Sequence, residues 1–234
     1  MGYVVRAPEI PSLAVKGEAG RFPVRRIFCV GRNYAAHARE MGRDPDREPP
    51  FFFCKPADAA FDAGPDDGAR IPYPPETENL HYEAELTVAI GTGGTDIPQA
   101  DALGHVYGWA ASLDLTRRDL QLAARDAGRP WDWGKAFDRS APIGTIARRD
   151  DAPGLDLQGG AIRLLQNGET RQDAVLGELI WSVPEVIAAI SRSMALRPGD
   201  LVMTGTPAGV GPIRRGDALR VEIDGLPACA LRIG

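Results

Sequence analysis

Three carboxylates in the middle of the chain have the types and spacing of a metal site. Glu83 and Glu85 stand two residues apart in NLHYEAELTVAIG, so on a β-strand both side chains leave the same face. Unpaired carboxylates at that distance repel, and one keeps its proton unless a cation lies between them. A strand face on which both glutamates simply meet water is the alternative, and alternation alone does not separate the two readings. Asp114, in AASLDLT, adds a third carboxylate at the end of an apolar strand, where an unpaired charge is costly.

Three carboxylates on rigid strands form an all-oxygen ligand set. Such a set is typical of the hard cations Mg²⁺, Mn²⁺ and Ca²⁺. The three histidines do not have the spacing of a zinc site, and no cysteine is close in sequence to the carboxylates. We therefore expect a hard divalent ion and not zinc.

A histidine and a glutamate upstream have the spacing of an oriented general base. His37 and Glu40 are three residues apart in a short stretch of helical character, so their side chains can touch. A carboxylate that holds one imidazole nitrogen leaves the other nitrogen to accept a proton from water. An ordinary surface histidine beside a glutamate is the alternative reading. His105, which precedes a strand, is interpreted as structural.

Lysine is rare in this chain, and two lysines stand in apolar surroundings. Only three of the 27 basic residues are lysine, and Lys55 in FFFCKP and Lys135 in WDWGKAFD are two of them. Each either reaches the surface with its ammonium or is a compact donor that the fork of an arginine could not replace. The glycine-rich segment TGTPAGVGP at residues 204–212 lacks the pattern of a P-loop. It is either a plain turn or a loop whose backbone N–H groups face a carboxylate or oxyanion.

Strands must position these groups, and the clearest strand is predicted over residues 80–90. Its even positions are apolar or aromatic and its polar side chains occupy odd positions, so we expect one apolar and one polar face. A second strand is expected over residues 107–115. Thr116, with Asp119 three residues later, predicts a capping box for a helix that ends at Gly128.

The remaining pattern predicts many short elements joined by turns. Expected in chain order are a strand at 26–30, one or two helical turns at 34–41, a loop at 43–50, a strand at 51–54, irregular connections at 56–78, a hairpin turn at Asn167-Gly168, a capped helix from Ser182 to about Met194, a turn at 198–200 leading into a short strand, and a hairpin at Asp224-Gly225. Strands outnumber helices and do not alternate with them. The fold class predicted is α+β and β-rich, a mixed β roll or sandwich.

Composition narrows the function classes. The chain has 234 residues with 44% hydrophobic and 25% charged residues, which is typical of a single ordinary globular domain. A net charge of -5 argues against nucleic-acid binding, and no stretch approaches the length of a membrane span. Three scattered cysteines and an N-terminus without a signal-peptide pattern predict a cytoplasmic protein.

Six segments in order resemble the fumarylacetoacetate hydrolase family, and most of all its single-domain fumarylpyruvate and acylpyruvate hydrolases. They are CVGRNYAAHAREMG, FCKPADA, NLHYEAELTVAIG, LDLTRRDLQ, GKAFDRSAPIG and LVMTGTPAGVGP. The resemblance covers about residue 25 to the C-terminus. It implies residues 1–24 as a lead-in, one catalytic domain over 25–234 with the mixed β-sandwich roll of the family, and a homodimer.

The resemblance also implies roles for individual residues. Glu83, Glu85 and Asp114 match metal ligands that normally hold Mg²⁺ or Mn²⁺, with Ca²⁺ as a substitute. His37 and Glu40 match the family's water-activating dyad, and Lys135 its active-site lysine. Substrate-binding positions are matched by Arg118 and Gln121, and further positions near the site by Arg32, Asn33, Lys55, Gly205 and Thr206. Where many relatives have a second histidine this chain has Tyr82, which by alternation points away from Glu83, so altered packing is expected and not loss of the metal.

The function expected is metal-dependent hydrolysis of a C–C bond in a small β-diketo acid, with fumarylpyruvate as the leading substrate. Decarboxylation of oxaloacetate or a related keto acid, hydrolysis of another acylpyruvate, and isomerisation of an unsaturated diacid are alternatives on the same site. A protein that only captures the ligand is a further alternative. The set of His37, Glu40 and Lys135 argues against it, because a pure binder needs no general base.

Overall fold

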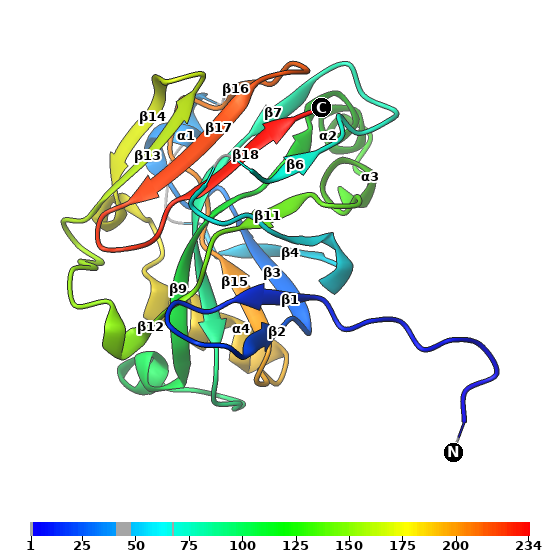
Figure 1. Ribbon diagram of the computed structural model, residues 1–234. Helices are drawn as coiled ribbons and strands as arrows, with labels where there is room; N and C mark the ends of the chain where they lie inside the picture. The colour runs from blue at the N-terminus through cyan, green and yellow to red at the C-terminus, as the bar shows by residue number, and fades with distance from the viewer. Residues whose placement is uncertain (1, 41–47, 67) are drawn as a thin grey trace.

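Strands are the predominant secondary structure, and they pair into a few sheets (Figure 1). The computed structural model describes residues 2–40, 48–66 and 68–234, with the side chains of Ala38 and Glu40 outside what it describes. The expected loop at 43–50 therefore lies largely outside the described residues.

The largest sheet contains eight strands and mixes parallel with antiparallel pairs. In hydrogen-bonded order it consists of β4 (Phe51–Lys55), β3 (Arg26–Gly31), β15 (Asp200–Met203), β8 (Ala84–Ile90), β9 (Val106–Leu113), β11 (Ala141–Ile143) and β5 (Ala60–Asp62), with β12 (Ala147–Arg148) beside β9. The pairs β15–β3 and β11–β5 are parallel, whereas β3–β4, β15–β8 and β8–β9 are antiparallel.

Smaller sheets and short helices complete the fold. A five-stranded sheet consists of β14 (Glu169–Val175), β13 (Ala161–Gln166), β17 (Ala218–Ile223), β18 (Cys229–Ile233) and β6 (Arg70–Ile71). A three-stranded sheet consists of β10 (Thr116–Arg117), β7 (Leu80–Tyr82) and β16 (Gly211–Pro212), and a two-stranded sheet of β1 (Ser12–Ala14) and β2 (Arg21–Pro23). The α-helices are α1 (Ala35–Glu40), α2 (Arg118–Asp126), α3 (Asp132–Lys135) and α4 (Val183–Ser193), and the 3₁₀ turns are η1 (Ala57–Ala59), η2 (Gln99–His105), η3 (Arg149–Asp151) and η4 (Leu176–Glu178).

The eight-stranded sheet is buried on both faces. The five-stranded sheet contacts it across β8 and β9, and Phe28 and Val30 of β3 belong to the apolar cluster between the two sheets. The alternate residues Ile27 and Cys29 belong to a second cluster, which includes Leu13 of β1. Because successive side chains of a strand point to opposite faces, β3 supplies both clusters. This arrangement confirms the predicted α+β, β-rich sandwich.

The predicted strand over residues 80–90 is broken at Glu83, contrary to expectation. Residues Leu80–Tyr82 pair within the three-stranded sheet, whereas Ala84–Ile90 pair within the eight-stranded sheet. Every residue of β8 is buried, so the expected polar face does not meet water. Thr87 shows how a polar side chain is accommodated there, because its hydroxyl donates to Ser112 Oγ at 2.6 Å.

The predicted capping box at Thr116 is also wrong. Thr116 pairs with β7 and its hydroxyl donates to the carbonyl of Asp114, and the helix begins two residues later at Arg118. Asp119 accepts hydrogen bonds from Thr77 and from the Glu78 N–H instead, so it fastens the preceding loop to α2. Tertiary contacts here override a local signal.

Other local signals are confirmed. Asn167-Gly168 joins β13 to β14 with both residues at positive φ, as a two-residue hairpin turn requires. Ser182 N–H donates to Glu185 Oε2 at 2.9 Å in the capping box of α4. Gly128, at φ +63°, ends α2. The irregular region 56–78 contains the short elements η1, β5 and β6, which the sequence pattern did not predict.

The N-terminal residues are partly packed against the domain. Val15 forms a bridge with Ile146, and Lys16 N–H donates to the Ile146 carbonyl at 2.8 Å. Residues before β1 extend away from the sheets (Figure 1). The proposed division into a lead-in over 1–24 and a catalytic domain over 25–234 stays a prediction.

Within the described part of the chain, no helix combines the length and the apolar character needed to cross a membrane.

A buried carboxylate fastens the central strands together. Asp200, at the start of β15, is fully buried and accepts hydrogen bonds from Arg25 at 2.8 Å, Arg26 at 3.1 Å and the N–H of Arg197 at 2.9 Å. The parallel pair β3–β15 therefore begins at a charge-assisted junction.

Asp200→Ala is expected to lower the free energy of unfolding by about 2 kcal/mol, because it leaves the Arg197 N–H and both guanidinium groups without their acceptor. Urea unfolding followed by tryptophan fluorescence measures the loss. The matched control is Asp173→Ala, which removes an exposed partner of Arg163 and should cost less than about 0.5 kcal/mol. Equal losses in the two variants would contradict a special role for this junction.

Candidate metal centre and active site

Two neighbouring strands bring the three carboxylates together. Glu83 stands at the junction of β7 and β8, Glu85 lies in β8, and Asp114 directly follows β9. The β8–β9 register places Glu85 opposite Ser112, and the Asp114 N–H donates to the Glu83 carbonyl at 2.9 Å. All three residues are buried, and one oxygen from each lies within 4.8 Å of the others. The alternative of two glutamates on a water-facing strand is therefore wrong.

Cationic side chains surround two of the three carboxylates. Lys135 Nζ lies 2.7 Å from Glu83 Oε2 and 2.7 Å from Asp114 Oδ2, and Arg118 Nη2 lies 2.5 Å from Glu83 Oε1. Burial alone would raise the pKa of Glu83, but Lys135, Arg118 and His37 lower it below its ordinary value. Burial would lower the pKa of Lys135, but Asp114 and Glu83 raise it. Both groups are therefore charged at neutral pH.

Glu85 is in a different electrostatic position. Burial, and then the negative charges of Asp114 and Glu83, raise its pKa well above the ordinary value, although the Gly205 N–H donates to its Oε2 at 2.7 Å. Neighbouring carboxylates thus destabilise the charged form of Glu85, and a bound cation would stabilise it. The donor set is all oxygen and sits on rigid strands, which fits a hard divalent ion such as Mg²⁺ or Mn²⁺.

Lys55 contacts Asp114 but is not among the residues that line the cleft. Its side chain is fully buried, with Nζ 2.9 Å from Asp114 Oδ1 and within hydrogen-bonding reach of the carbonyls of Leu115 and Lys135. It thus ties β4 to the end of β9 and to α3. The expectation that Lys55 binds substrate stays a prediction.

Helices α2 and α3 bring three polar side chains to the same place. Arg118 and Gln121, three residues apart, share one face of α2, and Arg118 Nη1 donates to Gln121 Oε1 at 2.5 Å. Gly134 allows α3 to approach closely, because a Cβ at that position would lie 2.9 Å from the backbone of Gln121. The residue that follows, Lys135, consequently enters the site beside Gln121.

His37 faces the carboxylates from α1. It is buried, lines the same cleft, and is close enough to Glu83 to lower the pKa of that carboxyl group. The backbone of Glu40 lies in the last turn of α1, but its side chain is outside the described residues. The predicted pairing of His37 with Glu40 therefore stays a prediction.

The segments that contain Arg32 and Gly205 pack against each other next to the carboxylates. Arg32 lines the cleft in a left-handed conformation, at φ +55°, with its guanidinium 5.2 Å from the centre of the Phe51 ring. The buried amide of Asn33 donates to the carbonyls of Trp181 and Thr204 at 2.9 and 2.8 Å. A Cβ on Gly205, at φ +100°, would lie 2.7 Å from Asn33 Cβ, so glycine permits this contact.

The cleft gathers most of the predicted residues. Of the ten non-metal residues expected at the site, those that line it are Arg32, His37, Arg118, Gln121, Lys135 and Thr206. Asn33, Lys55 and Gly205 do not line it. Lys55 contacts Asp114 and Gly205 contacts Glu85, whereas Asn33 bonds the carbonyl of Thr204 next to Gly205.

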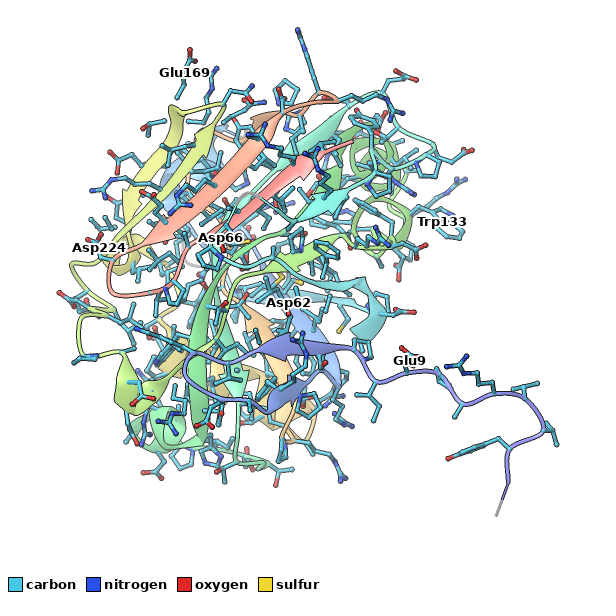
Figure 2. All side chains as sticks on the ribbon, viewed as in Figure 1. Glu9, Asp62, Asp66, Trp133, Glu169 and Asp224 are labelled. Atoms are coloured by element: carbon cyan, nitrogen blue, oxygen red, sulfur yellow. The ribbon has the colours of Figure 1, made fainter. Side chains whose placement is uncertain are left out.

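The sequence reasoning missed an aromatic and cationic part of the wall. Phe53 and Trp131, whose rings are 5.9 Å apart, line the cleft together with Arg125 of α2. The only signal was the aromatic context of the two lysines. Trp133 looks equivalent to Trp131 in the sequence WDWGK, yet it is 80% exposed and points away from the domain (Figure 2).

Tyr82 occupies the main apolar cluster. It is buried, and its hydroxyl lies against Gly211, where a Cβ would be 2.6 Å away. Glycine at position 211 leaves room for the Tyr82 hydroxyl, and the three carboxylates lie together. The expected change in packing relative to other family members stays a prediction.

Comparison with known proteins agrees with this arrangement. The family description "Fumarylacetoacetate (FAA) hydrolase C-terminal" matches residues 26–234. A crystal structure of a fumarylpyruvate hydrolase from Pseudomonas aeruginosa, in complex with Mn²⁺ and pyruvate, is 51% identical with a TM-score of 0.96 and 99% of each chain covered.

Curated relatives carry two different activities in their names. A fumarylpyruvate hydrolase of a Ralstonia species is 42% identical over 196 residues, which cover 83% of this chain and 98% of the relative. A mitochondrial oxaloacetate tautomerase of Mus musculus is 37% identical over 209 residues, which cover 89% of this chain and 91% of the relative. The expected hard divalent cofactor is confirmed by the gathered carboxylates together with the Mn²⁺ of the Pseudomonas relative. The chain belongs to the fumarylacetoacetate hydrolase family.

Proposed function

We propose that the enzyme hydrolyses fumarylpyruvate to fumarate and pyruvate. One observation carries the proposal: three buried carboxylates, a histidine and a lysine meet in one cleft of a chain that is 51% identical to a fumarylpyruvate hydrolase. That relative was crystallised with pyruvate, which is one of the two products of this reaction.

The carboxylates would hold the cofactor. Glu83, Glu85 and Asp114 would ligate a divalent ion, which when bound supplies Lewis acidity toward the carboxylate and 2-oxo oxygens of the substrate. Lys135 and Arg118 already pair with Glu83 and Asp114, whereas burial and these two carboxylates raise the pKa of Glu85, so a bound divalent ion would favour the charged form of Glu85.

His37 is the proposed general base, with Glu40 orienting it. It accepts a proton from water, whose oxygen forms a bond to the carbonyl carbon of the fumaryl group. The bond between that carbon and the methylene carbon then breaks, and its electron pair stays with the methylene carbon. A proton delivered to this carbon completes pyruvate, and the water oxygen remains in fumarate.

Lys135, Arg118 and Gln121 are the proposed hydrogen-bond donors for developing negative charge. Their side chains are buried in fixed positions, with Lys135 Nζ held between two carboxylates. Donors that need no reorganisation stabilise an oxyanion more effectively than mobile ones. Lys55 and Gly205 are proposed to position the ligands, because Lys55 pairs with Asp114 and the Gly205 N–H donates to Glu85. Asn33 is proposed to support the loop of Gly205 through its hydrogen bond to the Thr204 carbonyl.

Oxaloacetate is the second candidate substrate, since several relatives at 36–41% identity are named oxaloacetate tautomerases. Tautomerisation removes a proton from the enol oxygen, adds one to the carbon that is doubly bonded to the enol carbon, and breaks no C–C bond. Decarboxylation would instead release CO₂ and leave pyruvate. A homodimer in the cytoplasm is the proposed state of the protein, on the basis of the family resemblance and the sparse cysteines.

The test of substrate is loss of the conjugated enol absorbance of fumarylpyruvate with Mg²⁺, with Mn²⁺ and after chelation. We expect metal-dependent decay that chelation abolishes and fresh Mn²⁺ restores, with fumarate and pyruvate formed in equal amounts. Oxaloacetate is assayed in parallel for enol decay, CO₂ and pyruvate. Turnover of oxaloacetate without turnover of fumarylpyruvate would replace the proposed substrate while leaving the metal site intact.

The base is tested by separating turnover from metal binding. His37→Ala should lower kcat by a factor of about 10²–10⁴ with Mn²⁺ binding retained, because the base is lost and the ligands remain. Glu83→Ala should lose both Mn²⁺ binding and metal-dependent turnover. His105→Ala is the matched control, since the imidazole of His105 donates from Nδ1 to the Thr92 carbonyl and lies outside the cleft. Full activity in His37→Ala would overturn the assignment.

A further inference from the structure

One residue of β14 departs from the pattern of its strand. Gln172 is 1% exposed, whereas its strand neighbours from Glu169 to Val175 are half-buried or exposed. The strand lies at the edge of the five-stranded sheet, away from the strands that carry the carboxylates. A buried amide in such a strand must have specific partners, because an unpaired one is costly.

Gln172 lies on the inward face of β14 together with Ala174, which packs against the apolar cluster. Leu164 of β13 pairs with Gln172, but Leu165 pairs with Thr170, so Arg171 is an extra residue on β14. Such a bulge disrupts the pairing locally and bends the strand next to Gln172. The loop at 204–212 packs directly on the bulge, because a Cβ on Gly209, at φ +92°, would lie 2.3 Å from the Arg171 carbonyl oxygen.

The Gln172 amide joins two segments that carry the site. Its Oε1 accepts a hydrogen bond from the Ala84 N–H at 3.0 Å, and its Nε2 donates to Thr206 Oγ1 and to the Pro207 carbonyl, both at 2.8 Å. All of these contacts are buried. Ala84 is the residue where the chain passes from the three-stranded to the eight-stranded sheet.

Both segments bear directly on the carboxylates. Ala84 stands between Glu83 and Glu85, so its N–H fixes the backbone from which both side chains leave. On the other side, the residue before Thr206 is Gly205, whose N–H donates to Glu85 Oε2. One amide therefore holds the backbone under two ligands and the loop that orients one of them.

We propose that Gln172 is a positioning residue for the metal centre, acting from the second sheet through Ala84 and the loop at 204–212. Groups that orient ligands typically change metal affinity by about 10–100-fold when they are removed. The inference rests on the metal site of the proposed function, but it does not depend on which keto acid is the substrate.

The test measures Mn²⁺ binding to protein from which metal has been removed with a chelator. The electron paramagnetic resonance signal of free Mn²⁺ reports the unbound fraction. Gln172→Leu keeps the volume of the side chain and removes its three hydrogen bonds, and it should raise the Kd for Mn²⁺ by about 10–100-fold. Gln172→Glu keeps an acceptor for the Ala84 N–H but loses the donors, and it should raise the Kd by at least about fivefold. Because Mn²⁺ is the probe, the result is independent of turnover.

Two controls separate positioning from general loss of structure. Gln166→Leu removes an amide of the same hairpin that bonds Pro212 and Asp217, and Ile223→Ala opens a cavity in the same five-stranded sheet. Both should keep the Kd for Mn²⁺ within about twofold of the parent value, although Ile223→Ala unfolds at lower urea concentration.

Parent affinity in folded Gln172→Leu, or in Gln172→Glu should the leucine variant not fold, would overturn the proposal. An equal loss of affinity in Ile223→Ala would also overturn it, because the effect would then follow stability. Failure of the proposed function has a different signature, namely parent protein that binds Mn²⁺ tightly and leaves fumarylpyruvate unchanged.

Discussion

Three carboxylates enclosed by protein within 4.8 Å of one another are the constraint on which the rest of this structure depends. Their mutual repulsion opposes folding unless cations stand close by. The chain supplies Lys135 and Arg118 at the front and Lys55 behind, all by hydrogen-bonding or ion-pair contact. Arg118 and Lys135 come from the short helices α2 and α3, so the packing of these helices against the strand ends brings the cations to the carboxylates. Burial and the other two carboxylates raise the pKa of Glu85, and a divalent ion would favour its charged form.

The backbone beneath the site is built to keep its groups in place. Glu83 lies where the chain leaves one sheet and enters another, and the Asp114 N–H secures its carbonyl. Glycines at 134, 205 and 209 let neighbouring segments approach to distances that a Cβ would forbid. Since a ligand set must be held within fractions of an ångström, such support governs metal affinity as much as the ligands do.

The same arrangement of groups would serve any 2-oxo acid, which explains why hydrolases and tautomerases can have similar sequences. An ion site beside fixed donors favours negative charge next to the oxo group, whichever bond then changes. What differs between the two reactions is whether a water molecule is activated and how the far end of the substrate is received. His37 is the residue proposed for the first, and Phe53, Trp131 and Arg125 line the cleft in which the second would be decided.

The sequence by itself determined the ligand types, the shared side of Glu83 and Glu85, the hairpin at Asn167-Gly168 and the capped start of α4, because these depend on residues close together in the chain. Family resemblance, carried by short motifs, supplied the residues of the cleft. Only the tertiary structure decided that β8 is buried on both faces, that the strand breaks at Glu83, that Lys55 lies behind Asp114, and that Gln172 reaches the site. These features arise from contacts between segments far apart in sequence. The local hydrophobic periodicity of a strand does not show which distant element will cover each of its faces.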